Sequence, residues 1–400
     1  MLNKKIILGI TGSIAAYKAA ELTRTLKKMG ADVQVVMTAS AKEFISPLTL
    51  QALSGKPVLE NMWEPSKGNG MQHISLSRMA DLILIAPASA NFIAKLANGL
   101  ADDLLSNLCL ARNCPLLIAP AMNKEMWLNP ATQRNIKLIQ NDSIELSGPE
   151  SGDQACGEEG FGRLIDEKIL ILDIKRALGT KEFINKKILI SCGATVERID
   201  DARAITNLSS GRMGFNIAEA AVTMGADVTI IYGRTDMYPP KGINQFYAPN
   251  HKEMSRAVKA NAASHDIFIS VAAISDYLPN RTNGKIKKKD KILNLELTKS
   301  VDILAETASE FSKLFCVGFA AESESIIKNG QLKLKSKKLD LVVANSIEGS
   351  MGELSAEIYL IDRKEVTHVT KRDKSELGFE IMKHIYKLTK SKGYINDLIN

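Results

Sequence analysis

Residues 3–12 read NKKIILGITG, which is a lysine pair, an apolar run and a glycine turn. A short apolar run without polar alternation is typical of a parallel strand that is buried on both faces. Helix-forming sequence follows, and the pentapeptide MGADV at 29–33 leads into the apolar run QVVMT at 34–38. The order strand, glycine turn, helix, Gly-Ala-Asp turn, strand predicts a βαβ unit.

The same order returns in the second half of the chain. Residues 185–194 read NKKILISCGA, MGADV recurs at 224–228, and the run TIIYG follows at 229–233. Further apolar runs continue each half: DLILIAP and PLLIAPAM in the first, DIFISVAA, FCVGFAA and DLVVAN in the second. We therefore predict two doubly wound, Rossmann-like α/β domains, each with a mainly parallel sheet. Because βαβ units resemble one another for physical reasons, duplication of one half stays an open alternative.

The domain boundary is expected where helix-forming sequence ends and the second opening strand begins. This gives a first domain at 1–178, a linker at 179–186 and a second domain at 187–400. The second half also has an extra polar segment, RIDDARAITNLSSGR at 198–212. It follows the carboxyl end of a predicted strand, where such sheets bind ligands.

Composition excludes several classes of protein. Of the 400 residues, 45% are hydrophobic and 24% charged, as in globular proteins. No signal-peptide pattern or membrane-spanning apolar run is present, so we expect a cytoplasmic protein without a membrane partner. The net charge of +7 raises a nucleic-acid hypothesis, but the lysines gather at 281–291 and 333–338 and aromatics are only 5%. Local lysine clusters fit a polyphosphate pocket better than a nucleic-acid groove, so no nucleic-acid partner is expected.

Small and hydroxyl-bearing residues follow the predicted strands of the first half. Glycine, backbone amides and hydroxyls at a helix start suit a phosphate. The turn is not G-x-G-x-x-G and no acidic residue follows the next strand, so a mononucleotide such as FMN fits better than NAD. Taken alone, a plain tight turn at Gly12 and a helix N-cap at Ser89 are equally good explanations. The candidate FMN-binding residues are Gly12, Ser13, Thr38, Ser40, Ser89 and Asn91.

Asn123 and Met126 lie in APAMNKEMW at 119–127, just past a predicted strand. An amide among thioethers and an indole suits a carboxylate or amide ligand in an apolar pocket. The alternative for the methionines and tryptophan is core packing. That alternative does not account for an asparagine at the strand terminus.

His73 and Cys156 are two further candidates. His73 is the lone histidine of the first half and follows EPSKGNG at 64–70; a lone histidine is more often a surface or core residue. Cys156 lies in ACGEEGFGR at 155–163, where the dense glycine disfavours helix and strand and suits a lid. Glu158 and Glu159 should disfavour its thiolate, which suits a proton donor. The alternative is an inert cysteine in a loop.

These motifs resemble the flavoprotein family of phosphopantothenoylcysteine decarboxylases over about residues 1–178. The motifs are G-x-T-G-S-I-A, the lone histidine, P-A-M-N-x-x-M-W and A-C-G-E-E-G-x-G-R, in that order. The resemblance implies that FMN oxidises the thiol end of the substrate to a thioaldehyde, which becomes the electron sink for loss of CO₂. The enethiolate is then reduced and protonated. By this resemblance Asn123 binds the substrate carboxylate or amide, His73 assists the oxidation and Cys156 donates the final proton.

In the second half, the loop ITNLSSGRMG at 205–214 has the glycine and hydroxyls of an anion site before a helix. Together with AAISDYLPNRTNGKIKKKD, GFAAE and KLKSKKLDLVVAN, it resembles the phosphopantothenate–cysteine ligase family. The fused order is that of the bifunctional bacterial coenzyme A biosynthesis family. This implies that phosphopantothenate attacks CTP, with Mg²⁺, to give an acyl-cytidylate, and that cysteine then displaces CMP.

By the same resemblance, Asn207 contacts the acyl intermediate and Lys285, or alternatively Lys287 or Lys288, assists its formation or turnover. The family's A-A-V-A-D reads AAISD at 272–276, and its N-P-D-I reads SVDI at 300–303. No metal ligand is assigned. The implied nucleotide and substrate residues are Ala272, Asp276, Lys285, Asp302, Ile303, Phe319, Lys333 and Lys337, with Met126 in the first half.

Three other functions are compatible with parts of this sequence. They are a non-catalytic FMN-binding regulator, another flavin enzyme such as a reductase or flavin prenyltransferase, and a basic nucleic-acid binder. The joint presence of His73, Asn123 and Cys156, with a ligase-like second half, favours catalysis. The resemblance also implies flavin-domain trimers and ligase-domain dimers, which a dodecamer would reconcile.

Overall fold

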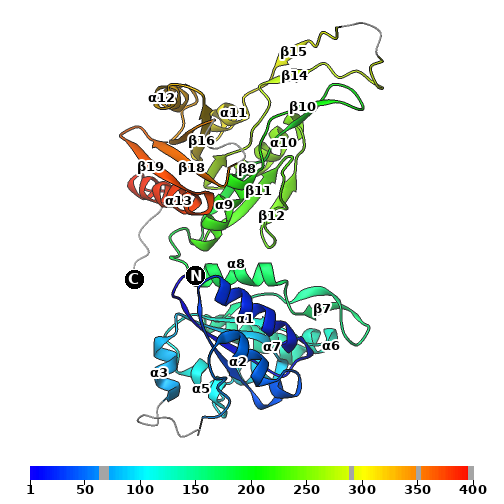
Figure 1. The fold of residues 1–400 in the computed structure, drawn as a ribbon, viewed down its shortest axis with the longest axis vertical. Coiled ribbons are helices and arrows are strands. Elements are labelled where there is room, and N and C mark those ends of the chain that lie inside the picture. Colours follow the sequence, from blue (N-terminus) through cyan, green and yellow to red (C-terminus); the bar gives the residue numbers. More distant parts are fainter. Residues whose placement is uncertain (63–71, 288–291, 348–352, 395–400) are drawn as a thin grey trace. The chain divides into compact units, whose positions relative to one another are not determined.

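The structure, a computed structural model, describes residues 1–62, 72–287, 292–347 and 353–394, with the side chains of residues 72 and 73 excluded. The chain divides into two compact units, Met1–Gly179 and Thr180–Asn400 (Figure 1). Each unit is an α/β domain built on a doubly wound sheet, so the predicted fold class is confirmed.

The first unit has a five-stranded parallel sheet in the order β2-β1-β3-β4-β5. Its strands are β1 (Lys5–Ile10), β2 (Asp32–Met37), β3 (Leu82–Ala88), β4 (Leu116–Pro120) and β5 (Glu145–Leu146). Successive side chains of β1 enter opposite faces: Ile6 and Leu8 join one apolar cluster and Ile7 joins the other. Burial on both faces explains why these strands show no polar alternation.

Helices cover both faces of this sheet. One cluster includes side chains of α1 (Lys18–Lys28), α2 (Pro47–Ser54) and α8 (Glu167–Ala177). The opposite cluster includes side chains of α4 (Ala90–Ala97), α5 (Leu104–Leu110) and α7 (Pro130–Asn141). The remaining helical segments of the unit are η1 (Ile14–Tyr17), η2 (Ala39–Glu43), α3 (Gln72–Met79) and α6 (Lys124–Leu128).

The glycine-rich segment forms a hairpin, so the expectation that dense glycine disfavours strand is wrong for this segment. Strands β6 (Glu150–Asp153) and β7 (Glu159–Arg163) pair antiparallel, with Cys156 in the connecting turn. Gly152, Gly160 and Gly162 have φ values of 155°, 154° and 132°, which other L-residues rarely adopt. Glycine therefore permits this distorted hairpin instead of preventing a strand.

The second unit has an eight-stranded sheet in the order β12-β11-β8-β13-β16-β17-β18-β19. The pairs are parallel except for β17–β18 and β18–β19. The strands are β8 (Lys187–Cys192), β11 (Asp227–Tyr232), β12 (Asn244–Tyr247), β13 (Ile267–Ser270), β16 (Phe315–Glu322), β17 (Leu341–Ser346), β18 (Ser355–Ile361) and β19 (Val366–Asp373).

An apolar cluster of this sheet includes side chains of α10 (His251–Ala262), α11 (Ile303–Glu310) and α12 (Ile326–Ser336). Elsewhere α9 (Arg212–Thr223) packs against β8 and β11, and α13 (Lys374–Ser391) packs against α9 and β18. Within the segment expected as a linker, Phe183 is fully buried and its ring contacts Tyr386 of α13 at 5.7 Å. Residues 180–186 are thus part of the second unit's packing.

The two MGADV turns have the same backbone bonds. Gly30 and Gly225 have φ values of 81° and 93°, and each follows the end of a helix. The N–H groups of Asp32 and Asp227 donate to the carbonyls of Lys4 and Lys186, each at 2.8 Å. In both turns glycine ends the helix and aspartate starts the neighbouring strand.

Two antiparallel pairs extend from the second sheet: β9 (Val196–Arg198) with β10 (Ala204–Thr206), and β14 (Tyr277–Pro279) with β15 (Leu297–Lys299) (Figure 1). Within the described ranges, no helix is long and apolar enough to cross a membrane.

Candidate active sites

The first cavity, of about 490 Å³, lies at the carboxyl ends of β1, β3 and β4 and beside the β6–β7 hairpin. In a sheet of order 2-1-3-4-5, connections leave β1 and β3 in opposite directions, and ligands bind at that switch point. The volume is in the range of small-ligand sites. Among its lining residues are the predicted Gly12, Ser13, Ser89, Asn123, Met126 and Cys156.

In the turn after β1, Ser40 lies so close to the backbone of Gly12 that no side chain fits at position 12. A Cβ atom on Gly12 would lie 2.6 Å from the Cβ atom of Ser40. Among the described residues, the backbone N–H groups of Gly12 and Ser13 have no protein acceptor. Open N–H groups at the start of a helical segment suit the phosphate of a mononucleotide.

Ser89 serves as a helix cap beside this turn. Its Oγ accepts from the N–H of Phe92 at 3.3 Å, and its own N–H donates to the Thr11 hydroxyl at 2.8 Å. Ser89 therefore both caps α4 and lines the cavity. Thr38, Ser40 and Asn91 are not among the residues that line the cavity; Ser40 packs beside Gly12, and Asn91 is exposed on α4.

Asn123 connects the end of β4 to the hairpin. Its Oδ1 accepts from the N–H of Glu125 at 2.8 Å, which caps α6. Its Nδ2 donates to the Glu158 carboxylate at 2.6 Å and to Cys156 Sγ at 3.4 Å. In this structure the amide of Asn123 therefore donates to a carboxylate of its own chain. Met126 is half-exposed at the cavity.

Cys156 is exposed at the hairpin turn, with its thiol 3.8 Å from Glu158 Oε2. Gln154, which sequence reasoning missed, holds this turn against α6. Its Oε1 accepts from the N–H of Lys124 at 3.0 Å, and its Nε2 donates to the carbonyl of Phe161 at 3.1 Å. No sequence pattern marked Gln154, because its partners become neighbours only when the hairpin folds.

His73 lies in the first turn of α3. Its side chain is outside the described part of the chain, so its role stays a prediction. Two cations that sequence reasoning did not assign, Lys18 and Arg163, also line the cavity.

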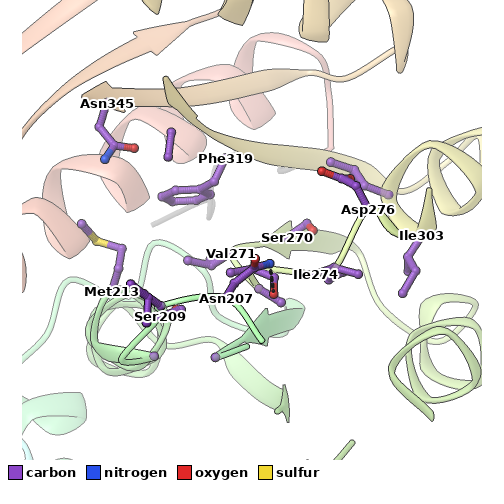
Figure 2. A pocket seen from close by; sticks show the side chains of 18 of the residues that line it. Asn207, Ser209, Met213, Ser270, Val271, Ile274, Asp276, Ile303, Phe319 and Asn345 are labelled. Atoms are coloured by element: carbon purple, nitrogen blue, oxygen red, sulfur yellow. Dashed lines mark hydrogen bonds between the residues drawn. The ribbon is translucent and has the colours of Figure 1, made fainter. Parts of the chain in front are cut away.

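The second cavity, of about 590 Å³, lies at the carboxyl ends of β8, β13 and β16. Connections leave β8 and β13 in opposite directions, so this is again a switch point. Figure 2 shows Asn207, Asp276, Ile303 and Phe319 around one hollow. The predicted residues that line it are Asn207, Ala272, Asp276, Asp302, Ile303, Phe319, Lys333 and Lys337.

Asn207 fastens the polar loop to the sheet, since its Nδ2 donates to the carbonyl of Ala273 at 3.0 Å. Gly211, with φ of 76°, directly precedes α9. Within the described ranges, the N–H groups of Ser210 and Gly211 have no protein acceptor. This loop therefore offers an anion the same kind of helix-start site as the first unit.

Two lysines and one aspartate also line this cavity. Lys333 Nζ donates to the carbonyl of Phe319, and burial together with the charge of Lys337 lowers the pKa of Lys333. Lys337 Nζ lies 2.5 Å from Asp302 Oδ2. Burial favours the neutral acid, but the bonds to Lys337 and the α11 N-terminus outweigh it and lower the pKa of Asp302.

Arg212 and Lys374 also line this cavity and were not predicted. Burial and the charge of Arg212 lower the pKa of Lys374. Lys374 begins α13, far along the chain from the other lining residues, so its sequence neighbourhood gave no signal.

Lys285 is not among the residues that line the second cavity; it is exposed on the segment between β14 and β15. Asp200 and Asp201 anchor this segment on both sides of Lys285. The N–H of Ile286 donates to Asp200 at 3.0 Å, and the N–H of Gly284 donates to Asp201 at 3.1 Å. Lys287 is exposed too, and Lys288 lies outside the described residues.

Asp200 is inaccessible to solvent and also accepts from the Arg203 side chain at 3.0 Å. Burial favours the neutral acid, but hydrogen bonds from three backbone N–H groups and from Arg203 outweigh it and lower the pKa of Asp200 to about 2. Since its unfolded pKa is about 3.9, the ionised carboxylate stabilises the fold above that pH. This contribution is lost as the pH falls towards 2.

Asp200→Asn is expected to reduce the ligase activity that the resemblance implies about 10-fold, because one N–H acceptor near Lys285 is lost. The implied decarboxylation should be unchanged. The melting-temperature difference from wild type should narrow as the pH falls from 5 to 3. Asp227→Asn, at an exposed position of β11, is the matched control. A wild-type ligase rate in Asp200→Asn would show that the segment needs no such anchor.

Among the described residues, no group of three or more histidine, cysteine, aspartate or glutamate side chains is placed to hold a metal ion.

Comparisons with known proteins agree with this two-unit organisation. The family model described as Flavoprotein matches residues 1–177, and the one described as DNA/pantothenate metabolism flavoprotein C-terminal domain matches residues 183–388. The coenzyme A biosynthesis bifunctional protein CoaBC of Vibrio vulnificus (strain YJ016) is 43% identical over 397 residues, covering 97% of this chain and 98% of that protein.

The corresponding protein of Vibrio cholerae serotype O1 is 45% identical over 351 residues, covering 87% of this chain and 88% of that protein. A solved C-terminal domain of a coenzyme A biosynthesis bifunctional protein CoaBC is 31% identical, covers 53% of this chain and 100% of its own, and superposes with a TM-score of 0.46. By its matching domains and its near full-length identity, the chain belongs to the family of bifunctional coenzyme A biosynthesis proteins.

Proposed function

We propose that the chain makes 4′-phosphopantetheine from 4′-phosphopantothenate in the cytoplasm, by CTP-dependent ligation of cysteine followed by FMN-dependent decarboxylation. The observation that carries this proposal is the pair of cavities at two separate switch points. The first combines an open phosphate-type turn with Asn123 and Cys156. The second combines an open anion loop with Asn207 and buried lysines.

In the second unit, the open N–H groups of Ser210 and Gly211 would bind phosphate oxygens. Lys333 and Lys337, which line the same cavity, would stabilise the charge that develops on leaving pyrophosphate. Asn207 would orient the acyl group while phosphopantothenate attacks the α-phosphorus of CTP, which forms an acyl-cytidylate and releases pyrophosphate. Cysteine then attacks the acyl carbon and CMP leaves, with Lys285 assisting.

Mg²⁺ is usually bound through substrate phosphates and one or two carboxylates, so we propose that it arrives with the triphosphate. Asp276 and Asp302 are the carboxylates that line the cavity. Asp302 is already paired with Lys337, which leaves Asp276 as the candidate contact for a metal–nucleotide complex.

In the first unit, the residues fit FMN. The open N–H groups of Gly12 and Ser13 suit its phosphate, and the small side chains Ala90 and Ala121 leave room along the wall. Bound FMN would supply the two-electron oxidation of the substrate thiol and the later reduction. Asn123 would hold the substrate carboxylate in the place that Glu158 takes in this structure.

Cys156 would give its proton to the product carbon after CO₂ has left. The glycines of the hairpin allow it to move with substrate, and Gln154 fixes where the hairpin joins α6. His73 would assist the oxidation as a base or orienting group.

We also propose that flavin units associate as trimers and ligase units as dimers, within a dodecamer. A molar mass of about twelve chains in light scattering would agree with this; a monomer would contradict it.

Separate assays distinguish the proposal from its rivals. Holoenzyme given phosphopantothenoylcysteine should release CO₂, and enzyme given phosphopantothenate, CTP, cysteine and Mg²⁺ should release CMP. A yellow protein that releases neither would favour the FMN-binding regulator.

A further inference from the structure

Lys18 and Arg163 place two positive charges at the first cavity. Lys18 is the first residue of α1, Arg163 is the last residue of β7, and both line the cavity. A Cβ atom on Gly152 would lie 3.0 Å from Arg163 Nη1, so the guanidinium lies against the backbone of β6. The hairpin thus carries one cation and the first helix carries the other.

The two cations are near enough to oppose each other's charge. Burial lowers the pKa of Lys18, and the charge of Arg163 lowers it further, while Glu150 and Asp166 act in the opposite direction. The backbones of both residues are hydrogen-bonded in their helix and strand. Within the described residues, neither the Lys18 ammonium nor the Arg163 guanidinium has a hydrogen bond or an ion pair with another side chain. Like charges at one cavity are unfavourable unless an anion joins them, and a cation pair is well suited to a dianion.

The proposed function, on which this inference rests, brings two phosphate monoesters to the cavity. One belongs to FMN and the other is the 4′-phosphate of the substrate. The Gly12–Ser13 turn already offers open backbone N–H groups to the first. Asn123 and Cys156 lie at the reactive end of the substrate, so the opposite end still needs a partner.

We infer that Lys18 and Arg163 form a subsite for a phosphate monoester dianion, and that this monoester is the substrate's 4′-phosphate. Arg163 is well shaped for this purpose, because a guanidinium can donate two parallel hydrogen bonds to phosphate. Since Arg163 closes the hairpin that carries Cys156, phosphate binding would also draw the thiol towards the reacting carbon.

The test compares two substrates on purified holoenzyme, phosphopantothenoylcysteine and the same compound without its phosphate, pantothenoylcysteine. Lys18→Met and Arg163→Gln should each lower kcat/KM for the phosphorylated substrate about 10- to 100-fold, the usual effect of losing a charged hydrogen bond. They should change kcat/KM for pantothenoylcysteine less than about 2-fold. FMN affinity, followed by flavin fluorescence, should stay within about 2-fold of wild type.

Lys137→Met and Arg134→Gln, exposed on α7, are the matched controls. Equal losses of kcat/KM for both substrates would overturn the inference. Weaker FMN binding, with an unchanged ratio of kcat/KM between the two substrates, would also overturn it and would assign Lys18 and Arg163 to the flavin phosphate. Wild-type enzyme that decarboxylates neither compound would instead refute the proposed function. If wild-type enzyme is active and Lys18→Met and Arg163→Gln have the same kcat/KM for the phosphorylated substrate as the control variants, only the phosphate subsite is refuted.

Discussion

Cys156→Ser is expected to lower 4′-phosphopantetheine formation from phosphopantothenoylcysteine at least about 100-fold, while the first turnover still releases CO₂. Loss of a general acid costs about 10²- to 10⁴-fold. A serine hydroxyl is a far weaker acid than a thiol, whose pKa is about 8.5 in the absence of neighbours. The serine variant can keep the contact to Asn123 but cannot supply the proton, so the enethiol should accumulate.

The measurement is single-turnover analysis by mass spectrometry, which separates the enethiol from 4′-phosphopantetheine. Cys114→Ser, which removes a half-buried thiol elsewhere in the same unit, is the control and should behave as wild type. Normal 4′-phosphopantetheine yield in Cys156→Ser would remove Cys156 from its proposed role. If Cys156→Ser neither releases CO₂ nor reduces the enethiol, the substitution has damaged the hairpin.

Asn207→Asp is expected to reduce the ligase rate at least about 100-fold and leave decarboxylation of supplied phosphopantothenoylcysteine unchanged. The amide now donates to the carbonyl of Ala273 at 3.0 Å. A carboxylate cannot donate there and would repel that carbonyl. It would also place negative charge beside the open N–H groups of Ser210 and Gly211, where it competes with phosphate.

The assay is release of CMP with CTP, phosphopantothenate and cysteine in excess. Asn244→Asp, at an exposed position of β12, introduces the same charge away from the cavity and is the control. A wild-type rate in Asn207→Asp would contradict the proposed role of this loop. Thermal melting should show that Asn207→Asp remains folded, since the substitution is exposed to the cavity and not to the core.

The two variants together test whether the activities are separate. Cys156→Ser should keep full ligase activity, and Asn207→Asp should keep full decarboxylase activity, because each change lies in a different folding unit.

Much of the fold could be predicted because local sequence and burial agree. Apolar runs such as residues 6–8 are buried on both faces of a sheet, and MGADV specifies the same turn in both halves. Residues directly after strands, such as Ser13, Asn123 and Ala272, could be assigned to cavities because carboxyl ends of parallel strands meet at one edge.

Residues that do not directly follow a parallel strand were harder to assign to a cavity from the sequence. Dense glycine argued against strands here, whereas β6 pairs with β7 and tolerates glycines at positive φ. Arg163, Gln154 and Lys374 reach their cavities only through long-range packing, which leaves no periodic mark in the sequence. The position of Lys285 depends on Asp200, which is 85 residues earlier in the numbering.

The most direct test of the central claim supplies holoenzyme with phosphopantothenate, cysteine, Mg²⁺ and either CTP or ATP, and follows every product by mass spectrometry. The account predicts 4′-phosphopantetheine with CMP, pyrophosphate and CO₂ in equal amounts when CTP is given. Phosphopantothenoylcysteine that accumulates without CO₂ would contradict the decarboxylase half. Absence of CMP and of the acylcysteine would contradict the ligase half.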